Sequence, residues 1–224
     1  MSSGLVGFFG KLPSHGDFVG RRLPPAVKDC FDRWLQAGLV RSKEDLGDEW
    51  LPVWLSSPIW RFVVAAGVCG EQAWAGVMMP SHDRVGRCFP LLLMAGIDGT
   101  PSMRACLTVH DGWFARLEAL ALSTLEEGFA LDSFDAALLA LMPFATALRP
   151  ADGDAVPAPA DADLAGRSAW WTIGSPLVTA CLAMCGGLPP AAAFISLLDG
   201  RWTDRNCASV EVDALGAGLG LGLL

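Results

Sequence analysis

The stretch that decides the fold is PSHDRVGRCFP at residues 80–90, a charged segment between two apolar runs. Residues 74–79 before it and residues 89–95 after it are short, apolar and bounded by Gly or Pro, which is typical of buried strands. A connection this short cannot hold a crossover helix, so the two strands are expected to pair antiparallel. The charged side chains between them then need partners, because a charge beside a core is costly unless it is paired.

A related pattern, PSHGDFVGR, occurs at residues 13–21. It is too brief to establish an internal repeat, but it supplies a second charged loop. We expect the two loops to be joined by ion pairs, because Arg binds carboxylates bidentately. Asp17 and Asp83 are expected to accept hydrogen bonds from nearby backbone amides or from Arg22, Arg61, Arg84 and Arg87. The partners predicted from outside the stretch at residues 80–90 are Asp17, Arg22 and Arg61.

Periodicity predicts elements on both sides of this stretch. Expected strands lie at residues 5–10, 59–67 and 170–173, with a short one at 210–212. The first expected helix begins at Pro24-Pro25 and stops at Gly38. A second begins at a capping box of Ser42 and Asp45 and includes Trp50 and Trp54. Four more are expected from Asp111 to Gly128, from Asp132 to Pro143, from Ser175 to Gly187 and from Pro189 through Leu198.

The fold class that follows is α/β of the α+β type. We expect a mainly antiparallel central sheet flanked by helices on both faces, an αβα sandwich. Residues 1–224 are expected to form a single domain with its motif-bearing core at residues 5–135. Residues 149–167 are rich in Asp and Pro and predict a mobile loop.

Composition excludes several classes of function. A formal net charge of −8 argues against nucleic-acid binding, since an acidic surface repels phosphate. No segment approaches the roughly 20 apolar residues of a membrane-spanning helix, so no membrane insertion is expected. The 7 Cys residues have no metal-binding spacing, and we interpret them as small buried thiols of a protein in a reducing cytoplasm.

Two loops contain residue types used in hydrolysis. His15 with Asp17, and His82 with Asp83, each follow a serine. Catalytic triads converge from separated positions and adjacent side chains point apart, so this pattern is weak, and no Gly-x-Ser-x-Gly turn accompanies it. A small metal-dependent or Ser/His hydrolase remains the alternative hypothesis. We otherwise expect no catalytic residues, no metal and no cofactor, because phosphate-binding and dinucleotide-binding loops are not recognisable.

Three separated motifs together resemble one family. They are GFFGKLPSHGDF at residues 7–18, SPIWRF at residues 57–62 and PSHDRVGRCFPL at residues 80–91. In order and spacing they resemble the TagF family of type VI secretion accessory proteins, over roughly residues 5–135. This resemblance implies a cytoplasmic, non-enzymatic protein that restrains secretion after translation by binding the forkhead-associated-domain scaffold protein of the system.

Some members of that family carry a metal-dependent phosphatase domain, but its Asp-Gly-x-Gly-Gly motif is not found in this sequence. Among the motif residues, we expect Trp60, Phe62 and Phe89 to be structural. A charged set is the candidate partner-binding patch, because arginine pairs well with carboxylate or phosphate on a partner. Its members are Lys11, Asp17, Arg61, Asp83, Arg84 and Arg87.

Overall fold

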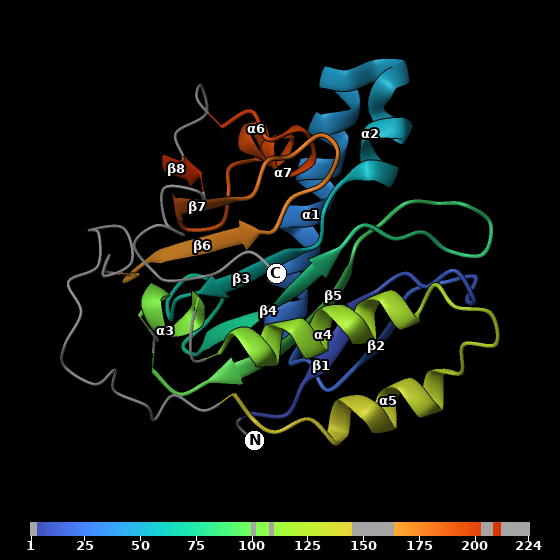
Figure 1. The fold of residues 1–224 in the computed structure, drawn as a ribbon, viewed down its shortest axis with the longest axis vertical. Helices are drawn as coiled ribbons and strands as arrows, with labels where there is room; N and C mark the ends of the chain where they lie inside the picture. Colours follow the sequence, from blue (N-terminus) through green and yellow to red (C-terminus); the bar gives the residue numbers. More distant parts are fainter. Residues whose placement is uncertain (1–3, 100–101, 108–109, 145–163, 203–207, 212–224) are drawn as a thin grey trace.

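The computed structural model describes residues 4–99, 102–107, 110–144, 164–202 and 208–211. Within them, eight strands form one sheet in the order β2-β1-β5-β4-β3-β6-β7-β8, and every neighbouring pair is antiparallel (Figure 1). The strands are β1 Gly7–Gly10, β2 Val19–Arg21, β3 Trp60–Val64, β4 Ala73–Met79, β5 Leu91–Ile97, β6 Arg167–Thr172, β7 Cys181–Gly186 and β8 Ala208–Glu211.

Helices cover both faces of this sheet, which confirms the predicted αβα sandwich. In Figure 1, α4 and α5 cross the front of the sheet, and α1 lies behind it. The helices are α1 Pro25–Leu46, α2 Trp50–Ser56, α3 Met103–Leu107, α4 Asp111–Ser123, α5 Leu131–Leu139, α6 Ala191–Phe194 and α7 Ser196–Asp199, and the 3₁₀ turn η1 Gly47–Glu49 joins α1 to α2.

Each face of the sheet has its own hydrophobic core, because successive side chains of a strand point to opposite faces. Trp60, Phe62 and Val64 of β3 pack in the cluster shared with α1, α2, α6 and α7. Val63, from the same strand, packs in the cluster shared with α3, α4 and α5. Burying one large apolar side chain contributes about 1.5–3 kcal/mol to stability, so each of the two cores is a major source of the folding free energy.

The opening prediction is confirmed in register. Strands β4 and β5 pair antiparallel from Ala73 opposite Ile97 to Met79 opposite Leu91, so residues 80–90 form the connection between them. All residues of both strands are buried. With β3 beside β4, these strands form the expected meander.

Two predicted helix boundaries near α1 are wrong. Gly38 does not end the helix, which continues to Leu46. A Cβ at position 38 would lie 2.3 Å from Cγ of Phe194, so this glycine permits close packing of α1 on α6. Ser42 is not a cap either, because its buried hydroxyl accepts a hydrogen bond of 2.9 Å from Nε1 of Trp50.

The second half of the chain also differs from expectation. The helix predicted from Ser175 to Gly187 is wrong, since Cys181–Gly186 forms strand β7 between β6 and β8. A short apolar run that is buried on both faces does not reveal by periodicity whether it is helix or strand. The predicted helix from Asp111 ends at Ser123, ahead of Gly128. Most of the predicted loop at residues 149–167 lies outside the described residues, although Arg167 already belongs to β6.

The prediction of free thiols is wrong for three cysteines. Cys30 of α1 and Cys69 of the β3–β4 connection form a disulfide with their Cα atoms 5.7 Å apart, and Cys185 is also disulfide-bonded. That Cα separation is in the normal range for disulfides, but nothing in the sequence spacing announces it. The argument from reduced thiols to a cytoplasmic location therefore no longer holds.

In the part of the chain that the structure describes, every helix is too short or too polar to cross a membrane.

The packing at Gly38 leads to a stability prediction. Gly38→Ala should destabilise the protein by about 1–3 kcal/mol in urea unfolding, because overpacking against Phe194 outweighs the gain in helix propensity. Gly112→Ala in α4 is the matched control, since a Cβ there meets nothing within 4 Å. The control should be neutral or stabilising by up to about 1 kcal/mol. Equal effects of the two changes would contradict the close-packing role of Gly38.

Candidate functional site

The buried carboxylate of Asp83 is the centre of an ion cluster, here called the ionic joint, which consists of Lys11, Asp83 and Arg87. Nζ of Lys11 lies 3.0 Å from one Asp83 oxygen, and Nε of Arg87 donates to the same oxygen at 2.7 Å. The other oxygen accepts from the backbone amides of Val85 at 3.1 Å and Arg87 at 2.9 Å. A carboxylate has about four lone-pair positions, so Asp83 is fully used.

This environment keeps Asp83 ionised. Burial alone would raise the pKa of its carboxyl group. The backbone amide of Arg87, the Lys11 ammonium, the Arg87 side chain and the amide of Val85 outweigh burial and hold the pKa well below its usual range. Asp83 therefore carries its charge throughout the physiological range, as a fixed anchor for two cations.

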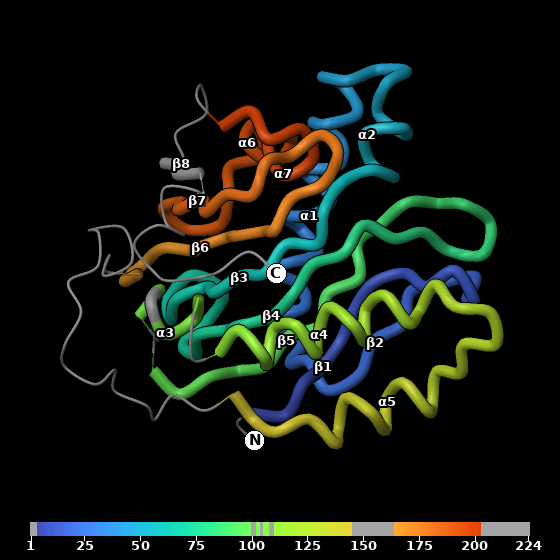
Figure 2. The backbone as a smooth tube through the Cα atoms, viewed as in Figure 1, coloured from blue at the N-terminus to red at the C-terminus, as the bar shows by residue number. Residues whose placement is uncertain are grey.

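The ionic joint ties the β4–β5 loop to the β1–β2 loop, and both extend from the same end of the sheet (Figure 2). Arg87 donates from Nη2 to the carbonyl of Gly16 at 2.7 Å, and the amide of Arg84 donates to the carbonyl of His15 at 2.8 Å. Ser81 donates from its hydroxyl to the carbonyl of Lys11 at 2.8 Å. The expected lock between the loops is present, but its ionic members are Lys11, Asp83 and Arg87.

The expected bonds from backbone amides and from Arg87 to Asp83 are confirmed. The three partners predicted from outside the stretch are wrong, because each makes contacts elsewhere. Asp17 accepts a hydrogen bond from the amide of Phe18, its own neighbour. Arg22 pairs with Asp135 of α5 and donates to the carbonyl of Val6. Its backbone φ of 65° is the only positive value at a non-glycine residue in the described part of the chain.

Arg61, the third, lies on the α4 face of the sheet, away from the two loops. It is 6% exposed and donates from Nε and Nη2 to both carboxylate oxygens of Glu118 at 2.8 Å, and from Nη1 to Asp111. Burial lowers the pKa of Arg61, but the bonds to Glu118 and Asp111 outweigh it and leave the pKa raised. The predicted patch of six residues is therefore not one continuous surface.

Some of the loop residues do reach the surface. Exposed side chains at the tips are Asp17, Phe18, Arg84, Val85 and Arg87. Phe18 is 44% exposed and Val85 69% exposed, which is high for apolar side chains. Lys11 and Asp83, in contrast, are 7% and 0% exposed and hold the loops from beneath. A partner can therefore touch the tips but not the centre of the joint.

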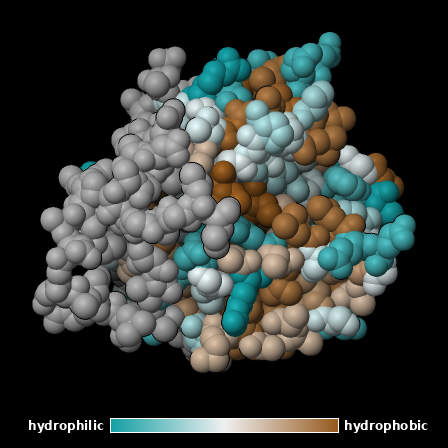
Figure 3. Space-filling model, viewed as in Figure 1, coloured by the Kyte–Doolittle hydropathy of each residue, from teal (hydrophilic) through white to brown (hydrophobic). Residues whose placement is uncertain are grey.

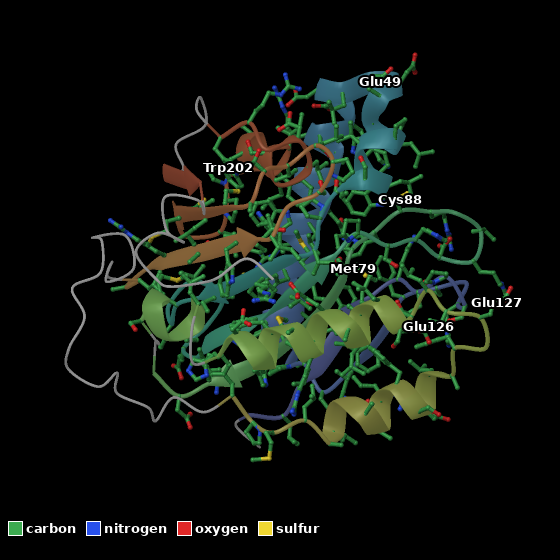
Figure 4. The ribbon with its side chains drawn as sticks, in the orientation of Figure 1. Glu49, Met79, Cys88, Glu126, Glu127 and Trp202 are labelled. Carbon is green, nitrogen blue, oxygen red and sulfur yellow. A yellow bond between two sulfur atoms is a disulfide. The ribbon has the colours of Figure 1, made fainter. Side chains whose placement is uncertain are left out.

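Aromatic packing supports the same loops from inside. The rings of Phe9, Phe18 and Phe89 contact one another with centroids 4.8–5.9 Å apart. Trp60, Phe62 and Phe89, which we expected to be structural, are all buried. Figure 4 places Cys88 at the base of the β4–β5 loop and Glu126 and Glu127 on the α4–α5 turn, at the same end of the molecule.

The residues of the hydrolase hypothesis do not form a reaction centre. The Ser81 hydroxyl is occupied by Lys11, and Nδ1 of His82 lies 2.9 Å from the carbonyl oxygen of Asp83. Ser14 Oγ lies 2.9 Å from Nδ1 of His15 on the exposed side of the other loop. Among the described residues, no group of three or more His, Cys, Asp or Glu side chains is placed to hold a metal ion.

Sequence reasoning missed a third ionic cluster of the structure. Arg21 and Arg22 of the β2 edge pair with Asp132 and Asp135 of α5, which fastens that helix to the sheet edge. The sequence interpretation treated the two aspartates only as a helix start. The one available signal was the doublet Arg21-Arg22, because two adjacent cations beside a core predict a carboxylate partner.

The chain is thus an antiparallel α/β sandwich whose motif residues brace two surface loops. Residues 7–141 match the family model described as TagF N-terminal domain, Type VI secretion system-associated. Because the match spans more than half of the 224 residues, the chain belongs to the TagF family of type VI secretion-associated proteins.

A solved structure agrees with this assignment. The chain is similar to PA0076 from Pseudomonas aeruginosa PAO1, with 38% sequence identity and a TM-score of 0.74. The similarity covers 88% of this chain and 94% of PA0076, so it includes the part beyond residue 141. A search of curated proteins found no match.

The low pKa of Asp83 predicts a pH-dependent contribution to stability. The contribution is fully present above the pKa of an unfolded Asp, about 3.9, and is lost as the pH falls towards the lower folded value. Asp83→Asn should lower the melting temperature at pH 7 by at least about 5 °C, because Lys11 stays buried without its counter-charge. The difference from wild type should shrink below about pH 4.

Asp17→Asn is the control for this experiment, because Asp17 is exposed and accepts only a local hydrogen bond. Its melting temperature should follow wild type at every pH. A constant difference between Asp83→Asn and wild type from pH 7 to pH 2 would show that the Asp83 charge is not the source of the effect.

The Arg61 cluster predicts strong energetic coupling between β3 and α4. Arg61→Leu should destabilise the protein by about 3–5 kcal/mol, because it leaves the half-buried Glu118 without its cation. Adding Glu118→Leu should recover at least about 1 kcal/mol in urea unfolding. Arg41→Leu, which breaks an exposed pair with Asp45, should cost under about 1 kcal/mol. If Arg61→Leu combined with Glu118→Leu lowers the free energy of unfolding by the sum of the two single effects, this coupling is ruled out.

Proposed function

We propose that this protein is a non-enzymatic, post-translational repressor of type VI secretion, and that it acts in the cytoplasm by binding the forkhead-associated-domain scaffold protein of the system. Membership of the TagF family supports a role in type VI secretion. The repression and the scaffold partner are what the sequence motifs imply by their resemblance to that family.

The surface at the tips of the two loops is the observation that carries the proposal. Arg84 and Arg87 stand exposed beside the apolar side chains of Val85 and Phe18. Figure 3 shows hydrophilic and hydrophobic residues next to one another at the end of the molecule that carries these loops. Interfaces are enriched in arginine and aromatic residues, and the cations favour an acidic or phosphorylated partner surface.

The ionic joint gives this surface a fixed shape. Arg87 is bound on one side to Asp83 and on the other to the carbonyl of Gly16, so the two tips are held together before a partner arrives. A preorganised surface loses less conformational entropy on binding. Arg84 differs from Arg87 in that its side chain is exposed and only its backbone amide bonds to the other loop. We therefore assign the contact with the scaffold mainly to Arg84.

A pull-down from cells that carry the secretion system tests this function. The tagged chain should recover the scaffold protein, and its overproduction should reduce secretion. Arg84→Glu should weaken recovery at least about tenfold through like-charge repulsion, without changing the near-UV spectrum of the folded protein. Loss of that spectrum would reassign Arg84 to structure.

Arg116→Glu is the charge-matched control, because Arg116 is exposed on α4 and does not belong to either loop. It should recover the scaffold as well as wild type. If the wild-type chain recovers no secretion component and its overproduction leaves secretion unchanged, the proposed repressor function is wrong.

A further inference from the structure

A hollow of about 290 Å³ lies between the edge strand β2 and the first turn of α1. Its lining includes Phe9, Phe18, Gly20, Arg21 and Lys28. This volume is at the lower limit of the roughly 300–1,000 Å³ of small-molecule pockets. It is large enough for one or two side chains of a partner.

The wall of the hollow is aromatic and its rim is cationic. The rings of Phe9 and Phe18 stack with centroids 5.4 Å apart and planes 9° apart. Nζ of Lys28 lies 5.2 Å from the centroid of the Phe9 ring. An apolar side chain entering the hollow would therefore pack on rings while a neighbouring group meets an ammonium.

One cation of the lining, Lys28, is available to a negative ligand. Arg21, Arg22 and Lys28 face a single acid, Asp29. Asp135 engages both arginines, and Asp132 engages Arg21. Lys28, in contrast, has no carboxylate within 4.0 Å among the residues that the structure describes. Lys28 is therefore the cation of this rim that a ligand carboxylate can pair with.

Addition of a whole strand to the edge of β2 is not favoured. The strand has only three residues, ends in Arg21 and is followed by Pro24 and Pro25, and such features blunt a sheet edge against pairing. Insertion of single side chains suits the geometry better, because anchor residues of interfaces are large side chains buried in pockets beside polar groups.

From these observations we propose that the hollow is an anchor site for a protein segment that presents an aromatic side chain next to Asp or Glu. The aromatic ring packs against Phe9 and Phe18, and the carboxylate pairs with Lys28. Phe18 belongs to the β1–β2 loop and also touches Phe89, so the hollow adjoins the loop tips of the proposed scaffold contact. The inference rests on the proposed function only in taking the ligand to be a protein.

A blocked tripeptide tests the site without the scaffold. The ¹⁵N-labelled chain is titrated with acetyl-Glu-Phe-Glu-amide and, separately, with acetyl-Lys-Phe-Lys-amide. The acidic peptide should shift the amide signals of Gly20 and Lys28 and should bind at least about tenfold more tightly than the basic one. Equal affinity for the two peptides, or no shift at Gly20 and Lys28, overturns the proposal.

Three variants sharpen this test. Lys28→Glu should abolish the preference for the acidic peptide and should fold normally, since acidic residues are favourable in the first turn of a helix. Phe18→Ser should weaken both peptides by removing one aromatic wall, and Arg116→Glu should change neither. Binding of the acidic peptide to Lys28→Glu as tight as to wild type contradicts the assigned role of Lys28.

The two proposals fail in different ways. If the tripeptide binds at the hollow but the chain recovers no scaffold from cells, the anchor site stands and the repressor function fails. If the scaffold is recovered by wild type and lost by Arg84→Glu, while the tripeptide shifts neither Gly20 nor Lys28, the anchor site fails alone.

Discussion

One buried carboxylate, that of Asp83, determines how the β1–β2 and β4–β5 loops are held together. Asp83 is inaccessible to solvent and accepts four hydrogen bonds, from Lys11, from the Arg87 side chain and from two backbone amides. A buried ion pair is not in itself a strong source of stability, because desolvation offsets its attraction. The Asp83 cluster instead fixes geometry. A conformation that left the buried carboxylate without these partners would cost far more free energy than the observed one.

Charges beside the core are also paired at two other places, where they hold helices to the sheet. Arg61 joins β3 to α4 through Glu118, and Asp135 joins α5 to the β2 edge through Arg21 and Arg22. The opposite face of the sheet depends on aromatic packing and on Gly38, which lets α1 approach Phe194. On the α4 and α5 face, ionic contacts thus act together with an apolar core, and on the α1 face close apolar packing predominates.

Sequence patterns were sufficient for the sheet around residues 80–90, because short apolar runs with turn residues between them have few other solutions. They failed at Cys181–Gly186, where burial on both faces removes the alternation that marks a strand. For Asp83 they were right in part, because backbone amides and Arg87 were among the expected donors but Lys11 was not. That its charge needed a cation follows from composition, but Lys11 is brought to Asp83 by the conformation of two loops, while Arg61 pairs with Glu118 on the α4 face.

The motif residues of this protein therefore divide into a buried set and an exposed set. Lys11 and Asp83 belong to the motifs but lie beneath the surface, where they fix the shape of the loops. Arg84 and Phe18 share those motifs and reach the surface. A substitution in the first set changes binding only by deforming the loops, so it cannot locate a partner. A substitution of an exposed side chain that leaves the ionic joint intact separates contact from folding, and this makes the loop tips and the adjoining hollow the places where the partner is to be sought.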